Sequence, residues 1–353
     1  MVSTTSTQAE DAALVGEFSR LLSTVRSDVE VKLQAVFEEK LTDARPHGPD
    51  VLALVDATRS LTMRGGKRFR AALVAVGAKA AGGADEDLRG AARIGVALEL
   101  LQTFLLVHDD WMDEDDVRRG GPTVHVMLTR ALGSAKLGAA SAILAGDFAA
   151  ALAQEAMVGA PANVLALFAR IQQDAVYGQQ LDLLARTEDI ERVHALKTGS
   201  YTVEGPLALG AEQAGASQAC RQAIHAFAAP IGVAFQLRDD LLGTFGTPEE
   251  TGKPAGNDLR AGKRTALVAE ALPLLDAEGR RKLEQVFGDA RASDDDVASA
   301  ASALAKCGAT ERVEARVTEL LHEARRALVS PALHPEGARL LGGAALAMTA
   351  RRA

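Results

Sequence analysis

Aromatic residues and cysteines are scarce in this chain. Phe, Trp and Tyr make up 4% of the 353 residues, so the core has to be built mainly from Ala, Leu and Val, a composition that favours helices over strands. The two cysteines, Cys220 and Cys307, belong to no metal-binding spacing, and we expect them to be small hydrophobic side chains in a reducing compartment. No uncharged apolar run reaches the ~18 residues that a membrane span needs.

Positive charge is also in short supply. The formal net charge of -8 argues against general nucleic-acid binding, which requires a basic surface. Any binding of phosphate groups therefore has to come from local clusters of Lys and Arg. The segment Met1–Thr7 is polar and lacks the apolar core of a signal peptide. These absences predict a cytoplasmic protein without stable insertion into a membrane.

Helical periodicity extends over nearly the whole sequence. We expect a disordered tail over residues 1–12, a first helix from about Asp11 to Thr42 and a second from about Val51 to Met63. Period-two alternation, internal repeats and low-complexity linkers are not evident, so residues 13–353 are predicted to form one all-α domain. One long irregular segment, Phe245–Gly262, is rich in Gly, Pro, Asp and Lys, and loops of this length are usually functional.

The strongest chemical signal is a group of aspartates at the end of an apolar stretch. Residues Leu100–Val107 lead directly into His108-Asp109-Asp110-Trp111-Met112-Asp113. Because residues four apart lie on nearly the same face of a helix, Asp109 and Asp113 should project together. Neighbouring carboxylates need cations to neutralise them, and Mg²⁺ prefers such hard oxygen ligands. Taken alone, the cluster is equally consistent with a solvated acidic helix end.

A second apolar stretch ends in the same way. Residues Ile231–Leu237 lead into Arg238-Asp239-Asp240, far downstream of the first cluster. Two apolar helices that each end in an Asp-Asp pair predict carboxylates facing each other across one cavity. Such facing sets can hold several metal ions around a diphosphate group.

Cationic residues gather beside glycines. Gly65 and Gly66 should end one helix and begin the next, and they are flanked by Arg64, Lys67, Arg68 and Arg70. A helix N-terminus with adjacent cations is suited to a diphosphate, although a solvated basic face is an equal alternative for this segment alone. Further candidate cations are Arg118, Arg119, Lys197, Lys253 and Lys263.

These motifs, in this order, resemble the trans-isoprenyl diphosphate synthases, or polyprenyl synthetases, from about Gly65 to Thr265. The stretch Gly65–Arg70 resembles the isopentenyl diphosphate motif of that family. Residues His108–Asp113 with Arg118–His125 are similar to its first aspartate-rich motif, and Lys197–Ser200 to its Lys-Thr element. The stretches Phe235–Asp240 and Gly252–Pro254 resemble the second aspartate-rich motif of the family and its lid.

The resemblance implies a role for each matching residue. It implies Mg²⁺ binding by Asp109, Asp113 and Asp239, with Asp110 and Asp240 in support. It implies that the allylic diphosphate is neutralised by Arg118, Lys197 and Lys253, with Lys263 as a further substrate-binding cation. It implies that isopentenyl diphosphate is held by Lys67, Arg70, Gln102 and Arg119. Finally, it implies that the forming allylic cation is stabilised by Thr198 and Gln236, without a covalent enzyme nucleophile.

The same resemblance sets expectations for the fold and the partners. It implies the isoprenoid synthase fold, a single-domain bundle of about 10–13 helices around a central cavity. It also implies three Mg²⁺ ions per active site, two diphosphate substrates and a homodimer.

One position departs from the family pattern. The second motif usually reads Asp-Asp-x-x-Asp, whereas here Gly243 stands in the third aspartate position. Glycine has no side chain to bind a metal. Because every cationic element is retained, we expect activity to survive with an altered metal affinity.

Product length should depend on the floor of the apolar cavity below the first motif. Phe104 precedes Asp109 by five residues, or about 7.5 Å along a helix, and is the candidate that stops chain growth. Leu101 and Leu105 are further candidates. The short first motif together with a bulky residue resembles enzymes with short products, C20 first and C15 next, while an ordinary core role for Phe104 and a C25 product stay open.

Two other functions share this fold. A class I terpene cyclase would use the metals but needs no second diphosphate site, so Lys67, Arg70 and Arg119 argue against it. A non-catalytic regulatory subunit should have lost its metal ligands, whereas both aspartate pairs are present. His108 and His125 are expected to be structural, and the terminal Arg351-Arg352 to be a solvated tail.

Overall fold

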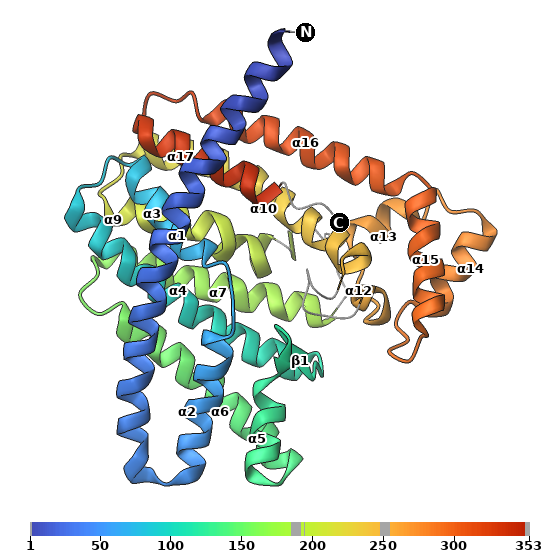
Figure 1. Ribbon diagram of the computed structural model, residues 1–353, viewed down its shortest axis with the longest axis horizontal. Helices are drawn as coiled ribbons and strands as arrows, with labels where there is room; N and C mark the ends of the chain where they lie inside the picture. The colour runs from blue at the N-terminus through green and yellow to red at the C-terminus, as the bar shows by residue number, and fades with distance from the viewer. Residues whose placement is uncertain (1, 185–191, 194, 248–254, 350–353) are drawn as a thin grey trace.

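The computed structural model describes residues 2–184, 192–193, 195–247 and 255–349 (Figure 1). The α-helices in this part are α1 (Val2–Ala44), α2 (Pro49–Met63), α3 (Phe69–Ala80), α4 (Asp85–Met112), α5 (Val124–Leu132), α6 (Ala135–Ala156), α7 (Ala162–Leu184), α9 (Gly205–Gln213), α10 (Gln218–Phe245), α12 (Asn257–Arg260), α13 (Ala266–Ala271), α14 (Ala277–Val286), α15 (Asp294–Lys306), α16 (Ala309–Ala327) and α17 (Pro335–Thr349). A 3₁₀-helix, η1 (Arg45–His47), and a π-helix, η2 (Ala195–Glu204), complete the helical elements of the described residues. The all-α class is confirmed, and the number exceeds 10–13 because short helices such as α12 and α13 are included.

The N-terminal segment differs from its prediction. Residues 2–12 are part of α1, where the sequence predicted a disordered tail. Gly16 is the lone glycine before the first proline, Pro46, so no residue in this stretch breaks a helix. Near this end an ion pair joins Asp11 to Arg325 of α16, and α1 packs along α17.

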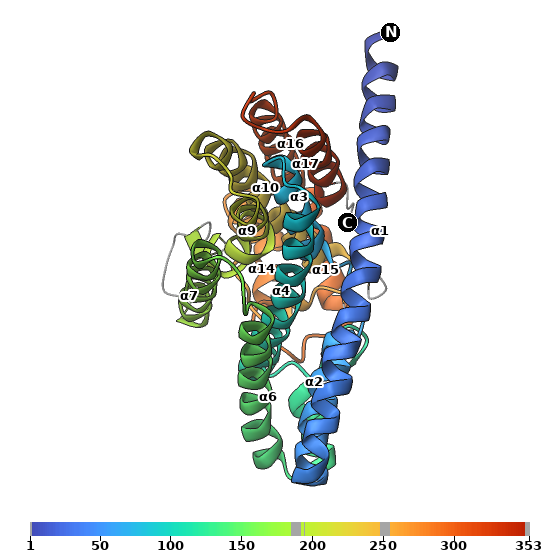
Figure 2. The same cartoon turned by 90° about the vertical axis from the view of Figure 1, so that its left-hand side faces the viewer.

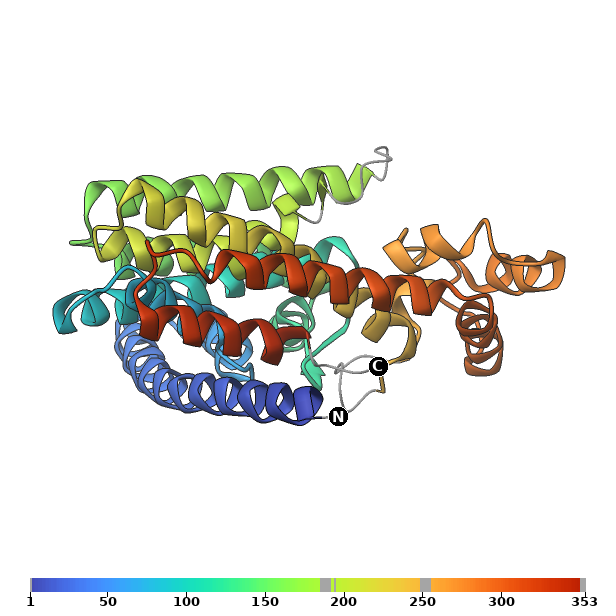
Figure 3. The ribbon, with the colours of Figure 1, turned by 90° about the horizontal axis from the view of Figure 1, so that it is seen from above.

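The helices are layered around α4. In Figure 2, α1 and α2 lie on one side of α4, and α6 and α7 lie on the other. Seen from above, α7 and α1 form opposite faces, with α10, α16 and α17 between them (Figure 3). The helices α14 and α15 project at one end of the molecule. This arrangement makes α4 and α10 the interior helices that carry the two aspartate clusters.

The helix α4 is a core helix by composition and by position. Its first turn contains Asp85, Glu86 and Asp87, which favourably oppose the partial positive charge of a helix N-terminus. Both α4 and α6 are long and apolar enough to cross a membrane by length and composition alone. Most of the apolar stretch of α4 is buried inside the protein, whereas less than half of that of α6 is buried.

The sequence predicted no strands, but the structure contains a small hairpin. Strands β1 (Val117–Arg118) and β2 (Gly121–Pro122) pair antiparallel, directly after the first aspartate cluster. The two turn residues, Arg119 and Gly120, both have positive φ angles, 52° and 69°. Two consecutive positive φ angles fit the right-handed twist of a tight hairpin, so the turn fixes the directions of Arg118 and Arg119.

Candidate active site

The end of α4 combines three carboxylates with two cations. Lys197 Nζ lies 3.2 Å from Asp109 Oδ1, and Arg118 Nη2 lies 3.6 Å from Asp109 Oδ2. Burial acts to raise the pKa of Asp109, but Lys197 and Arg118 hold it below its ordinary value. Burial and the neighbouring Asp109 raise the pKa of Asp113. The Asp113 carboxylate is therefore costly to ionise, and a bound cation would relieve that cost.

The two members of the first Asp-Asp pair have different surroundings. Asp109 is partly exposed, whereas Asp110 is 1% exposed. The Nε of Arg118 donates to Asp110 Oδ1 at 2.6 Å. The buried Asp110 thus orients Arg118, while the more accessible Asp109 is available to a ligand.

The second Asp-Asp pair repeats this division. Asp240 is 3% exposed and accepts two hydrogen bonds, from Gln236 Nε2 to Oδ1 at 3.0 Å and from the Ala266 backbone N–H to Oδ2 at 3.0 Å. The second of these bonds joins the end of α10 to the start of α13. Asp239 is half-buried. Asp240 is therefore a positioning residue in this structure, and Asp239 is the more accessible carboxylate.

Lys263 follows α12 and pairs with an aspartate of that helix. Its Nζ lies 3.9 Å from Asp258 Oδ1. Although burial acts to lower it, the pKa of Lys263 is raised by Asp258, Asp113 and Asp109. The charge of the first aspartate cluster thus acts on the predicted substrate-binding Lys263.

Lys197 is presented by the π-helix η2. The ammonium group also pairs with Asp182 of α7, with Nζ 2.5 Å from Oδ2. Burial acts to lower the pKa of Lys197, but Asp109 and Asp182 raise it well above its ordinary value, so the side chain stays charged. A β-carbon on Gly178 of α7 would collide with the Lys197 backbone, so this glycine permits the close approach of α7 and η2. π-Helices often occur at functional sites.

Three of the four predicted isopentenyl diphosphate residues converge. Arg70 Nη1 donates to Gln102 Oε1 on α4, and Arg70 Nη2 donates to Thr202 Oγ1 at 2.8 Å. The guanidinium of Arg70 also lies over the Tyr201 ring, 4.6 Å from its centroid. Arg119 Nη1 donates to the Gly65 carbonyl at 3.3 Å. The fourth residue, Lys67, is exposed on the same loop.

The β1–β2 hairpin separates the two cationic groups. Its Arg118 points to the aspartates of α4, and its Arg119 points to the loop between α2 and α3. Burial together with the nearby Arg68 and Arg70 lowers the pKa of Arg119, while Glu99 opposes this effect. Several arginines close to one another, with fewer carboxylates than cations among them, are typical of a site for a multiply charged anion.

Beneath that loop lies a buried ion pair that sequence reasoning missed. Arg68, which adopts a positive φ of 54°, donates from Nη1 to Glu99 Oε2 at 2.7 Å and from Nη2 to the Thr62 carbonyl at 2.9 Å. The side chains of Arg68 and Glu99 are 1% and 4% exposed. A glutamate in the apolar run before the first motif was the available signal, because a buried charge needs a partner.

A cavity of about 250 Å³ extends from Asp109 along α4, α7 and η2. Its wall contains Phe104, Leu105, His108, Asp109, Met112, Ala175, Gln179, Leu183, Lys197 and Tyr201. The Phe104 ring packs edge-to-face on His108, with centroids 4.9 Å apart. Leu101 is fully buried in the core and is not among the residues that line this cavity. Phe104 and Leu105 are thus at the wall, as the sequence predicted, and Leu101 is not.

The aspartates provide suitable chemistry for Mg²⁺, but they do not already surround a common point. Among the described residues, no group of three or more His, Cys, Asp or Glu side chains is close enough to hold a metal. The cations Lys197 and Arg118 take up part of the carboxylate charge instead. One buried oxygen, Asp110 Oδ2, has no hydrogen-bond partner in the described part of the chain, but Asp110 is 1% exposed and binds Arg118. The more accessible carboxylates of Asp109 and Asp239, from two helices, supply the hard oxygens that fit a divalent ion.

Some predicted residues lie outside the part of the chain that the structure describes. These are Lys253, the side chain of Thr198, and the terminal Arg351-Arg352.

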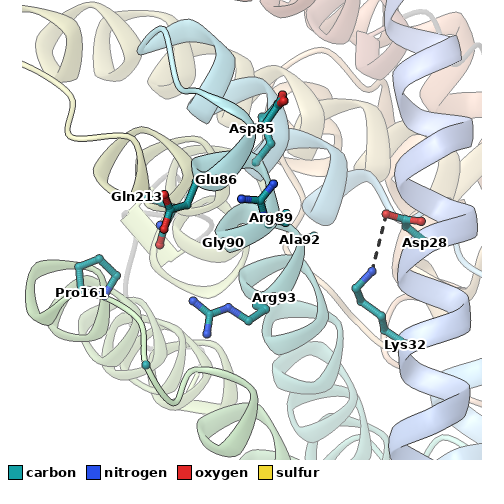
Figure 4. Close-up of a pocket in the computed structure, with 12 residues that line it drawn as sticks. Asp28, Lys32, Asp85, Glu86, Arg89, Gly90, Ala92, Arg93, Pro161 and Gln213 are labelled. Carbon is teal, nitrogen blue, oxygen red and sulfur yellow. Dashed lines mark ion pairs between the residues drawn. The ribbon is translucent and has the colours of Figure 1, made fainter.

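A larger hollow than this cavity lies elsewhere. A groove of about 930 Å³ runs between α1, the start of α4 and the α6–α7 connection (Figure 4). Its charged residues are of both signs and include an ion pair between Asp28 and Lys32, 3.7 Å apart. None of the predicted site residues lines it. Size alone therefore does not locate the active site, whereas the convergence of Asp109, Lys197 and Tyr201 does.

The sequence is similar to those of known prenyl diphosphate synthases. The family described as polyprenyl synthetase matches residues 52–304. The chain is 35% identical to geranylfarnesyl diphosphate synthase of Aeropyrum pernix over 83% of this chain and 92% of that protein. It is 37% identical to (2E,6E)-farnesyl diphosphate synthase of Mycobacterium tuberculosis over 70% of this chain and 68% of that protein.

A solved structure agrees as well. Geranylgeranyl pyrophosphate synthase from Corynebacterium glutamicum, in complex with isoprenyl diphosphate and magnesium, superposes with a TM-score of 0.85 and 32% identity. The match covers 95% of this chain and 99% of that one. The chain therefore belongs to the polyprenyl synthetase family and is a prenyltransferase with the isoprenoid synthase fold.

Proposed function

We propose that the protein condenses isopentenyl diphosphate head-to-tail with an allylic diphosphate in a Mg²⁺-dependent reaction. The product is a short-chain prenyl diphosphate, geranylgeranyl diphosphate (C20) first and farnesyl diphosphate (C15) next. The observation that carries this proposal is the β1–β2 hairpin. Its Arg118 binds the carboxylates of α4, and its Arg119 binds the loop between α2 and α3. The reaction has two diphosphate substrates, and only the allylic one loses its diphosphate group. Two separate diphosphate sites, one with carboxylates and one without, match this difference.

The first site would hold the allylic diphosphate. Asp109, Asp113 and Asp239 would bind Mg²⁺, which we propose to be three ions per active site. Bound Mg²⁺ would supply Lewis-acid stabilisation of the leaving diphosphate. Lys197 and Arg118 already lie beside Asp109 and would neutralise charge on the same group. Asp110 and Asp240 would orient these partners from buried positions.

The second site would hold isopentenyl diphosphate through Arg70, Arg119 and Lys67. Gln102 and Tyr201 keep the Arg70 guanidinium in place before any ligand binds. The allylic C–O bond would break, and the isopentenyl double bond would supply the electron pair for the new C–C bond. The proton lost from the isopentenyl unit would pass to the released diphosphate, so no enzyme nucleophile is required.

The growing chain would enter the cavity below Asp109. Phe104 and Leu105 line that cavity and would limit the product length. The relatives described above are named for farnesyl, geranylgeranyl and geranylfarnesyl products. The C20 proposal rests on the short first motif and on the aromatic ring of Phe104, which packs on His108 at the cavity wall.

A cytoplasmic homodimer completes the proposal. The apolar side chains of α6 that face outward include Leu137, Ile143 and Leu144, which are 53%, 40% and 58% exposed. A contiguous exposed apolar surface on a buried-core protein is suited to contact with a second copy. We propose that a second copy of the chain, and not a membrane, buries the exposed apolar side chains of α6.

The test is product analysis with Mg²⁺, labelled isopentenyl diphosphate and the C5, C10 and C15 allylic diphosphates in turn. Elongated prenyl diphosphates that depend on Asp109 would support the proposal and identify the primer and chain length. A cyclic hydrocarbon formed without isopentenyl diphosphate would show a class I terpene cyclase instead. No turnover with any primer would favour a non-catalytic subunit.

A further inference from the structure

The space beside Gly243 is filled by a carboxylate from another helix. Gly243 lies one turn after Asp239, on the same face of α10. A β-carbon built on Gly243 would overlap with Asp258 Oδ2, so any side chain at this position would displace the Asp258 carboxyl group. Asp258 belongs to α12, which packs against α10. A carboxylate therefore occupies the place that the third residue of an Asp-Asp-x-x-Asp motif would use.

The surroundings of Asp258 are those of a ligand-binding group. Its side chain is 20% exposed, which is the same value as for Asp109. The carboxylate accepts no hydrogen bond from the described residues, and its one cationic neighbour among them is Lys263, at 3.9 Å. Lys263 also experiences the charges of Asp113 and Asp109. Asp258 and Lys263 thus pair beside the end of α10, at the position of Gly243.

A purely local role does not account for this placement. The residue that precedes α12 is Gly256, and this helix has no side-chain cap. The backbone N–H of Lys263 closes the turn through the Asp258 carbonyl, at 2.9 Å, which any residue could supply. The carboxyl group of Asp258 is therefore not required to build α12 or the turn after it.

We propose that Asp258 is the metal-binding carboxylate that replaces the missing third aspartate of the second motif. This inference rests on the proposed Mg²⁺-dependent function. Asp239 from α10 and Asp258 from α12 together form the second carboxylate set, with Gly243 required as the space between them. The set is thereby tied to the α12–α13 segment and to Lys263, and does not depend on α10 alone.

The test is the binding of Mn²⁺, followed by electron paramagnetic resonance in the presence of an unreactive allylic thiolodiphosphate. Asp258→Ala should weaken Mn²⁺ binding by about 10-fold to 100-fold. The double variant Gly243→Asp/Asp258→Ala moves the carboxylate back to α10 and should restore affinity to within a few-fold of the wild type. Asp295→Ala, which removes an exposed carboxylate on the neighbouring α15, is the matched control and should bind like the wild type.

Two results would overturn the proposal. One is wild-type Mn²⁺ affinity in Asp258→Ala, and the other is a double variant that binds no better than the single one, which would assign Asp258 to the support of Lys263. If Asp258→Ala does not fold, judged by the melting temperature without metal, Asp258→Asn replaces it with the same expectations. Turnover of the wild type with labelled isopentenyl diphosphate is measured separately, so failure of the proposed reaction remains distinguishable from failure of this assignment.

Discussion

The ends of α4 and α10 carry the same Asp-Asp pair in different surroundings. At α4 the pair is bound by charged groups, because Arg118 holds Asp110 and Lys197 holds Asp109. At α10 the buried Asp240 accepts hydrogen bonds from the amide of Gln236 and the backbone N–H of Ala266. In both pairs the second aspartate is the buried one.

This difference indicates how the two ends divide their work. The end of α4 is organised around cations that remain in place before a substrate arrives. The end of α10 is joined to α13 by the hydrogen bond from the Ala266 N–H to Asp240, so its position depends on the segment that follows. A ligand that bridges both ends would therefore contact two carboxylate pairs that different segments position.

The largest effect should come from the accessible aspartates. Asp109→Asn and Asp239→Asn should each lower kcat by roughly 10²–10³-fold, because they remove charge that stabilises the departing diphosphate. Asp240→Asn should cost less activity and instead lower the melting temperature, because it disturbs the link to Ala266. Steady-state kinetics and thermal unfolding of the three variants check this. Equal activity losses in all three would contradict the division of roles.

The next effect compares a buried ion pair between the α2–α3 loop and α4 with a half-exposed one between α10 and α16. Glu99→Gln should lower the free energy of unfolding by about 3–5 kcal/mol, since it leaves the buried Arg68 with only Glu30, at 3.8 Å, as a counter-charge in the described part of the chain. Glu314→Gln removes the partner of Arg238, and the loss should be smaller because Glu314 is 40% exposed. Urea unfolding of both variants measures the difference. Similar losses would show that the Arg68–Glu99 pair is not the anchor of its loop.

A smaller effect should follow from moving Lys197. Gly178→Ala places a methyl group against the Lys197 backbone and should reduce kcat by about 10-fold, a typical loss for a displaced catalytic group. Gly16→Ala is the matched control, because no atom lies within 4 Å of its new methyl group. The control should keep full activity and gain slightly in stability. Wild-type kinetics in Gly178→Ala would contradict the close packing of α7 on η2.

The smallest effect on rate should accompany a change in product. Phe104→Ala enlarges the cavity and should shift the products to longer chains while kcat changes little. Leu101→Ala serves as the comparison, because Leu101 is buried away from the cavity. That variant should lose about 2–5 kcal/mol of stability without a shift in chain length. Chromatography of the dephosphorylated products measures both, and longer products from Leu101→Ala alone would reverse the assignment.

The sequence predicted the parts of the site that local pattern determines. Apolar runs that end in aspartates gave the ends of α4 and α10, and the glycines flanked by cations gave the loop before α3. The hairpin was not predicted because each strand has two residues, too few to show an alternation of apolar and polar side chains. The π-helix was not predicted because the spacing of Lys197 and Tyr201 also fits an α-helix.

Contacts between distant segments could not be predicted in the same way. Nothing near Gly243 in the sequence indicates that Asp258 fills its space, since that contact depends on how α12 packs on α10. The pairing of Arg68 with Glu99 likewise depends on the crossing of the α2–α3 loop over α4. Leu101 was predicted as a further residue that sets the depth of the cavity, but the neighbouring helices enclose it in the core.

The most direct test of the division between accessible and buried aspartates is a count of bound Mn²⁺. Wild-type protein and four variants, Asp109→Asn, Asp110→Asn, Asp239→Asn and Asp240→Asn, would be titrated with Mn²⁺ in the presence of an unreactive allylic thiolodiphosphate. The account predicts that the Asp109 and Asp239 variants lose bound metal, while the Asp110 and Asp240 variants keep the wild-type number with at most a modest loss of affinity. Loss of metal in the Asp110 and Asp240 variants, with retention in the other two, would contradict it.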